Sequence, residues 1–330
     1  MNPNILKGIG LAFCIMFVSV ASINLFTYST YEEKENQSYQ ETFENNYKIF
    51  ALNQPSDMSF AGEEVPLNLI DVREKLDREL HVNTYWQSNT LFFIKRTHRW
   101  FPVIESILKN EGVPNDFKYL ALIESGLTQI VSPTGATGFW QIMKKTAPEY
   151  GLEVNSEVDE RYHVEKSTKA ACQYLKEAKE KFGSWTLAAA SYNMGQAGLA
   201  KQLNRQKVNN YYDLLLNTET SRYLFRILAA KHILSNPKQF GFNYRDKDLY
   251  PTISHKTVTL DSSVTNFVNY AAQLGINYKV LKYLNPWLRD KKLYNSKGKT
   301  YQIQIPDEHF INQLQTQLPI AESDTLDSKN

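Results

Sequence analysis

The stretch PNDFKYLALIESG, residues 114–126, is the part of the sequence that decides the fold. Pro114 suits the first turn of a helix, and the acid Asp116 complements the positive end of a helix. Apolar residues recur at helical spacing as far as Glu124, and Gly126 suits the left-handed cap that ends a helix. The stretch therefore predicts a helix with an apolar stripe facing a core.

Glu124 continues the stripe formed by Phe117, Leu120 and Ala121, because the four residues stand at positions i, i+3, i+4 and i+7. A carboxylate in this place is poorly solvated, and desolvation raises its pKa by favouring the neutral form. A neutral carboxylic acid can donate a proton to a glycosidic oxygen. The stripe alone is equally compatible with a buried glutamate that only bonds a helix terminus or an arginine.

Further patterns lie downstream of this helix, and they decide between the two interpretations. SPTGATGFWQIM spans residues 132–143, ASYNMG spans 190–195 and ETSRY spans 219–223. Together with Glu124-Ser125, this ordered set resembles the lytic transglycosylases of glycoside hydrolase family 23, which share the fold of goose-type lysozyme. Shorter matches resemble the membrane-bound D-type members of that family: GVP at 112–114, YLAL at 119–122, DER at 159–161 and FGSW at 182–185.

The resemblance implies roles for the matched residues. Glu124 is expected to protonate the bond between N-acetylmuramic acid and N-acetylglucosamine. The expected substrate-binding residues are Ser125, Ser132, Gln141, Met143, Tyr192, Asn193 and Tyr223. Ser125 has an alternative role as a helix cap, and Asn193 is expected to hold the helix turn or an acetamido group. Tyr192 is expected to hydrogen-bond Glu124 or the muramic sugar, whereas Trp140 fits core packing at least as well as sugar contact.

The loop after Glu124 departs from the family pattern. The family commonly has Asn-Pro where this chain has Thr128-Gln129, and the path to Ser132 is one residue shorter. These differences affect the expected substrate contacts and leave Glu124 untouched. Gly135 and Gly138 suit a loop that turns with positive φ or passes close to another group.

A helical pattern covers residues 67 to about 243. Ser167–Gly183 and Ser184–Gly195 each begin with a residue suited to capping a helix and end at a glycine, and a further helix follows Thr218. We therefore predict a mainly α fold, with a lysozyme-like helical catalytic domain at residues 67–245.

A small α+β module is predicted at residues 246–320. Alternation around Val258 and again at 301–305 predicts two strands, and helical pieces lie near 264–274 and 278–284. The order strand-helix-helix-strand resembles a degenerate LysM glycan-binding domain, on TLDSSV at 259–264, LKYLNP at 281–286 and YQIQIP at 301–306. The Gly-Asp-Thr of that family is replaced by Asp261-Ser262-Ser263, so glycan binding by the module is left open.

The N-terminus predicts export. Lys7 precedes a charge-free apolar run over residues 9–26, which suits either a signal peptide or a signal anchor ending near residue 27. Residues 28–66 are polar and predict an irregular spacer, and 321–330 predict a disordered tail. We therefore expect a periplasmic protein, with the membrane as a partner if the first segment is retained.

Composition excludes several classes of protein. The formal net charge is +2 and no basic stripe is present, so nucleic acid is not an expected partner. The 2 cysteines and 6 histidines are scattered without metal-ligand spacing, so no metal or cofactor is expected. The expected partner is the glycan strand of peptidoglycan, and the oligomeric state is left open.

The predicted reaction uses one carboxylate. Glycosidases normally use two carboxylates, but Glu124 is the acid that we assign to the site, and we interpret Asp159 and Glu160 as parts of a structural ion pair with Arg161. This pattern favours a lytic transglycosylase that forms 1,6-anhydro-N-acetylmuramic acid. The alternatives are a hydrolytic muramidase on the same fold and a non-catalytic murein-binding protein.

Overall fold

The structure is a computed structural model that describes residues 33–44 and 49–308. The chain divides into two compact units, residues 1–51 and 52–330. In the first unit, residues 33–44 are helical. The predicted signal segment, residues 1–27, and the predicted tail, residues 321–330, lie outside the described residues. Among the helices that are described, none has the length and apolar character needed to cross a membrane.

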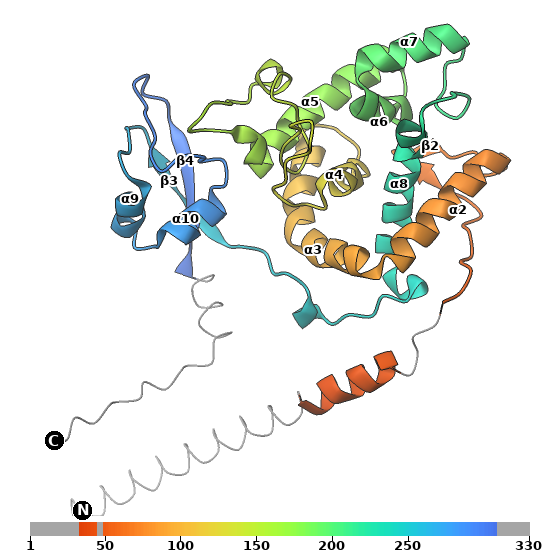
Figure 1. Cartoon of the computed structure of the whole chain (residues 1–330), viewed down its shortest axis with the longest axis horizontal. Helices are drawn as coiled ribbons and strands as arrows, with labels where there is room; N and C mark the ends of the chain where they lie inside the picture. Colours follow the sequence, from red (N-terminus) through yellow and green to blue (C-terminus); the bar gives the residue numbers. More distant parts are fainter. Residues whose placement is uncertain (1–32, 45–48, 309–330) are drawn as a thin grey trace, which may run out of the picture. The chain divides into compact units, whose positions relative to one another are not determined.

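Helices dominate the second unit, and the prediction of a mainly α fold is confirmed (Figure 1). The helices before the C-terminal module are α2 (Ile70–Tyr85), α3 (Gln87–Asn110), α4 (Phe117–Ser125), α5 (Val164–Phe182), α6 (Trp185–Met194), α7 (Gln196–Gln206) and α8 (Thr218–Ser235). Figure 1 shows α4 enclosed by its neighbours, and it packs against α3 and α8. The short helix α4 is therefore the centre of the helical core.

The enclosure of α4 explains its composition. Tyr119, Leu122 and Ile123 are buried in addition to the predicted stripe, and a helix that is apolar on most sides is typical of a buried position. Gly126 ends the helix with φ of +59°, as predicted, and its N–H donates to the Leu122 carbonyl at 2.7 Å. The sequence thus places Glu124 near the C-terminal end of a helix that has few contacts with water.

The helix caps agree in part with the sequence prediction. Ser184 accepts a hydrogen bond from the Leu187 N–H and caps α6 as predicted. Ser167 does not cap α5, which begins at Val164, because the Ser167 side chain is buried and donates to the Val164 carbonyl. Asn217 caps α8 through the Thr220 N–H at 2.9 Å. The error at Ser167 arises because helix α5 is extended by packing that the local sequence does not reveal.

Part of the predicted spacer belongs to the folded unit. Residues 59–64 form a two-stranded hairpin, β1 (Ser59–Phe60) and β2 (Glu63–Glu64). The Phe60 ring is fully buried and meets the Phe117 ring edge-on, with centroids 5.1 Å apart. Irregular structure was therefore the wrong expectation for these residues, because a single buried aromatic ring anchors an otherwise polar stretch.

The C-terminal module has the predicted order of elements, strand, helix, helix and strand. These are β3 (His255–Leu260), α9 (Phe267–Gln273), α10 (Tyr278–Leu284) and β4 (Tyr301–Pro306). The strands pair antiparallel with Val258 opposite Ile303. The hydrophobic core of the module also contains Val158 and Tyr162, which belong to the segment before α5. The module is thus completed by residues from the helical part of the chain.

Candidate active site

Glu124 occupies the last turn of α4 and is partly exposed. The hydroxyl of Tyr223 on α8 donates a hydrogen bond to Glu124 Oε1. Tyr223 is itself only 1% exposed, so the bond is shielded from water. Packing of α8 on α4 therefore fixes one oxygen of the carboxyl and leaves Oε2 as the oxygen that carries a proton when Glu124 is neutral.

Burial raises the pKa of Glu124, in the direction expected from the apolar stripe. The hydrogen bond from Tyr223 and the positive charge of Arg226 oppose this rise, and the negative charge of Glu219 adds to it. Burial and the charge of Glu124 also raise the pKa of Tyr223 well above its ordinary value. Tyr223 thus stays a hydrogen-bond donor while Glu124 holds its proton more tightly than a carboxyl in water.

Ser125 connects α4 to the loop that follows it, residues 127–143. Its buried hydroxyl donates to the Phe139 carbonyl at 2.9 Å. The Thr128 hydroxyl donates back to the Ser125 carbonyl at 2.6 Å, and Trp140 is buried with its indole N–H on Thr168. The Ser125 hydroxyl therefore binds protein atoms. Trp140 packs in the core, which is the interpretation that its sequence pattern favoured.

The 127–143 loop carries the predicted residues Ser132, Gln141 and Met143. Ser132 closes a turn, because its hydroxyl accepts the Ala136 N–H at 3.0 Å. Gln141 has a positive φ of 47° and donates from its side chain to the Gly138 carbonyl at 2.8 Å. Met143 is 42% exposed. The side chains of Ser132 and Gln141 thus shape the loop, and Met143 is the most exposed of the three.

Tyr192 and Asn193, at the end of α6, contact this loop and α8. The Tyr192 hydroxyl donates to the Trp140 carbonyl at 2.7 Å, and burial, followed by the charge of Glu124, raises its pKa well above the ordinary value. Asn193 accepts from the Thr220 hydroxyl at 2.8 Å. Tyr192 therefore lies near Glu124, but its hydroxyl donates its hydrogen bond to the loop.

The sequence patterns gave no role to two charged residues of α8, although Glu219 begins the ETSRY motif. Arg226 donates from its guanidinium to the Ile123 carbonyl at 2.9 Å, and Glu219 lies within hydrogen-bond reach of the Asn193 amide at 3.4 Å. They stand three residues after and four residues before Tyr223, on the same face of a helix. Helical spacing from Tyr223 is the signal that would have found both.

A pocket of about 460 Å³ is lined by Ile123, which precedes Glu124 on α4, and by Glu219 and Arg226 of α8, whose charges act on Glu124. Trp86, which is 62% exposed, lines the same pocket. The remaining lining residues are Glu79, Val82, Asn83, Asn89, Phe93, Thr218 and Arg222. The pocket combines an exposed aromatic ring with charged and amide groups, which suits a polar ligand with apolar faces.

Asp159 and Glu160 both form ion pairs. Asp159 and Arg161 form a buried ion pair at 2.7 Å, and Glu160 pairs with Lys166. The interpretation of Asp159 as part of a structural ion pair is thus confirmed, although Glu160 takes a different partner. Within the described residues, no group of three or more histidine, cysteine or acidic side chains is placed to hold a metal ion.

Comparison with known protein families agrees with this arrangement. Residues 101–215 match the transglycosylase SLT domain, and residues 256–309 match the soluble lytic transglycosylase C-terminal LysM-like domain. The chain therefore carries an SLT transglycosylase domain followed by a LysM-like domain. Glu124, Tyr192 and Asn193 lie inside the first match, whereas Tyr223 lies beyond its end.

The chain is similar to the membrane-bound lytic murein transglycosylase D of Escherichia coli strain K12. The two are 27% identical over 273 residues, which cover 80% of this chain and 58% of that protein. The protein of the same name from Escherichia coli O6:H1 gives the same figures. The chain thus spans less than two thirds of the length of these relatives.

Proposed function

We propose that the chain is a lytic transglycosylase that cleaves the β-1,4 bond between N-acetylmuramic acid and N-acetylglucosamine in peptidoglycan. The observation that carries the proposal is the Glu124 carboxyl, whose pKa is raised by burial and whose Oε1 is held by Tyr223. The match to an SLT domain and the relatives' name support the same reaction.

In this reaction Glu124 acts first as an acid and then as a base. The proton on Oε2 passes to the glycosidic oxygen, and the bond from that oxygen to C1 of the muramic sugar breaks. The C6 hydroxyl of the same sugar attacks C1 and gives its proton to Glu124, which closes the 1,6-anhydro ring. Attack from within the substrate replaces a bimolecular step by an intramolecular one.

The surrounding residues have supporting roles in this proposal. Tyr223 orients the carboxyl, and Arg226 limits the rise of its pKa. Trp86 offers a ring face to a sugar in the pocket lined by Ile123, Glu219 and Arg226. Ser125, Ser132 and Gln141 act through the shape of the 127–143 loop, and Met143 and Asn193 are the members of the predicted set that we retain as substrate contacts.

Hydrolysis is the competing reaction, because Glu219 supplies a second carboxylate close enough to raise the pKa of Glu124. A muramidase would use such a group to activate water. The mass of the product separates the two reactions, since the anhydro product lacks one water.

The place of action that we propose is the periplasm, at the membrane. The apolar run at residues 9–26 and the relatives' description as membrane-bound support this location. Glycan strands of peptidoglycan are the proposed partner of the SLT and LysM-like domains.

Replacement of Glu124 by glutamine tests the catalytic role. Glu124→Gln keeps the size of the side chain but has no proton to exchange, so we expect clearing of peptidoglycan suspensions to fall by about a hundredfold or more. Glu149→Gln, at an exposed position, is the matched control and should clear at the normal rate. Clearing by Glu124→Gln at the control rate would remove Glu124 from the mechanism.

A further inference from the structure

Residues 153–163, here called the bridging segment, contact the C-terminal module along their length. Val158 is 1% exposed and pairs with Leu288 in an antiparallel bridge. The Asp159 N–H donates to the Trp287 carbonyl at 2.9 Å, and the Arg289 N–H donates to the Glu157 carbonyl at 2.7 Å. The bridging segment thus forms part of the core and of the backbone bonding of the module.

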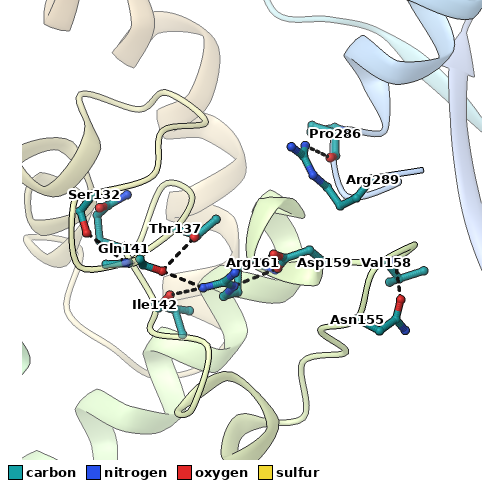
Figure 2. A network of polar contacts seen from close by, with 12 residues as sticks. Ser132, Thr137, Gln141, Ile142, Asn155, Val158, Asp159, Arg161, Pro286 and Arg289 are labelled. Atoms are coloured by element: carbon teal, nitrogen blue, oxygen red, sulfur yellow. Dashed lines mark hydrogen bonds and ion pairs between the residues drawn. The ribbon is translucent and has the colours of Figure 1, made fainter. Parts of the chain in front are cut away.

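Tyr162 is the residue of the bridging segment that packs between the module core and Arg289. Its ring belongs to the module core, and the Arg289 guanidinium lies over it, 4.0 Å from the ring centre. Arg289 is held in place by a hydrogen bond from its guanidinium to the Pro286 carbonyl at 2.8 Å (Figure 2). A cation and the face of an aromatic ring attract each other, and this attraction holds the Tyr162 ring in place without a covalent link.

Arg161, which precedes Tyr162, connects the bridging segment to the 127–143 loop. Its guanidinium donates to the Ile142 carbonyl at 3.1 Å (Figure 2) and to the Gly135 carbonyl at 3.0 Å. The Arg161 carbonyl lies so close to Gly138 that a Cβ there would stand 2.1 Å from the oxygen. The loop that carries Ser132, Gln141 and Met143 is therefore fixed by the residue next to Tyr162.

We infer that Arg289 is a positioning residue for the reaction, which acts through Tyr162 and Arg161 on the 127–143 loop. The module then contributes to turnover by holding this loop in place, whether or not it binds glycan itself. The inference rests on the proposed function for its kinetic part and on the contacts above for its structural part.

The test compares the full chain with Arg289→Ala, Arg289→Lys and the matched control Lys279→Ala, which removes the same charge from an exposed position on α10. With soluble uncrosslinked murein strands, we expect Arg289→Ala to lower kcat by about threefold at unchanged KM. Arg289→Lys should restore most of the rate, because it keeps a cation over the ring.

Hydrogen exchange supplies a readout that does not depend on activity. The Gly138 and Ile142 amides, which are bonded inside the loop, should exchange faster in Arg289→Ala, while α8 amides should not change. Unchanged loop exchange, or a kcat equal to that of Lys279→Ala, would overturn the inference. If the unaltered chain releases no product, the proposed function fails, and the exchange comparison still decides the role of Arg289.

Discussion

At the scale of single residues, Glu124 lies between opposing influences on its pKa. Burial raises the pKa, whereas Tyr223 and Arg226, both on α8, lower it. A group that must give a proton and then take one back works best when its pKa is near the working pH. The two α8 residues therefore oppose the effect of burial on the pKa of Glu124.

Removal of the Tyr223 hydroxyl tests this tuning. Tyr223→Phe deletes a hydrogen bond to a charged group, worth about 1.5–3 kcal/mol, so we expect a loss of about tenfold or more in turnover. Because the bond lowers the pKa of Glu124, its loss raises that pKa, and the alkaline fall in rate moves to higher pH. The pH profile of turnover measures both effects, with Tyr150→Phe as a control whose hydroxyl bonds Glu177 instead. An alkaline limb that stays in place would contradict the tuning role.

The sequence predicted the position of the site better than its contacts. The helical stripe and the motifs led to Glu124 and to the ring of Tyr192, but the bond from Tyr192 to the Trp140 carbonyl depends on how the loop folds back. Glu219 belongs to the ETSRY motif, but the motif does not reveal that its carboxylate lies close enough to raise the pKa of Glu124. Contacts of this kind are set by tertiary packing, which local patterns do not contain.

At the scale of elements, the 127–143 loop is held on two sides. Ser125 binds it to the end of α4 through the Phe139 carbonyl, and Arg161 binds it through the Gly135 and Ile142 carbonyls. The glycines predicted for positive φ or close approach are found in those roles, since Gly138 has φ of +79° and lies against the Arg161 carbonyl. The 127–143 loop is thus held in place by the hydrogen bonds from Ser125 and Arg161.

A pair of glycine substitutions separates backbone strain from close approach. Gly135→Ala and Gly138→Ala both place a side chain at positive φ, which costs about 1–2 kcal/mol. Only at Gly138 would the new Cβ meet a backbone oxygen, whereas at Gly135 nothing lies within 4 Å. We therefore expect Gly138→Ala to lose more stability in urea unfolding and more activity than Gly135→Ala. Equal losses would mean that the contact with Arg161 does not constrain the loop.

At the scale of the whole molecule, two residues of the segment before α5 complete the hydrophobic core of the C-terminal module. The sequence predicted the order of elements in the module, because its strands and helices have clear periods. It did not predict that Val158 and Tyr162 complete the module core, since these residues are distant in sequence from the module. The predicted boundaries at residues 245 and 246 remain predictions.

Deletion of residues 246–330 tests the contribution of Val158 and Tyr162 to the module core. The deletion would expose Val158 and Tyr162, and burial of one Val side chain contributes about 1.5–3 kcal/mol. Since 1 kcal/mol corresponds to about 2–4 °C in a domain of 150–250 residues, we expect the Tm of the helical region to fall by roughly 5 °C. Calorimetry of the shortened and full chains measures the change. An unchanged Tm would indicate that the two parts are stable independently.

The mass of the muropeptides released by residues 28–330 tests the proposed reaction most directly. Purified peptidoglycan is digested, and the products are analysed without chemical reduction, with a hydrolytic muramidase as the reference. Intramolecular attack by the C6 hydroxyl predicts products that end in 1,6-anhydro-N-acetylmuramic acid, each lighter by one water than the reference product. Glu124→Gln should release about a hundredfold less of these products. Products of the same mass as the reference would contradict the transglycosylase reaction and assign water activation to the site.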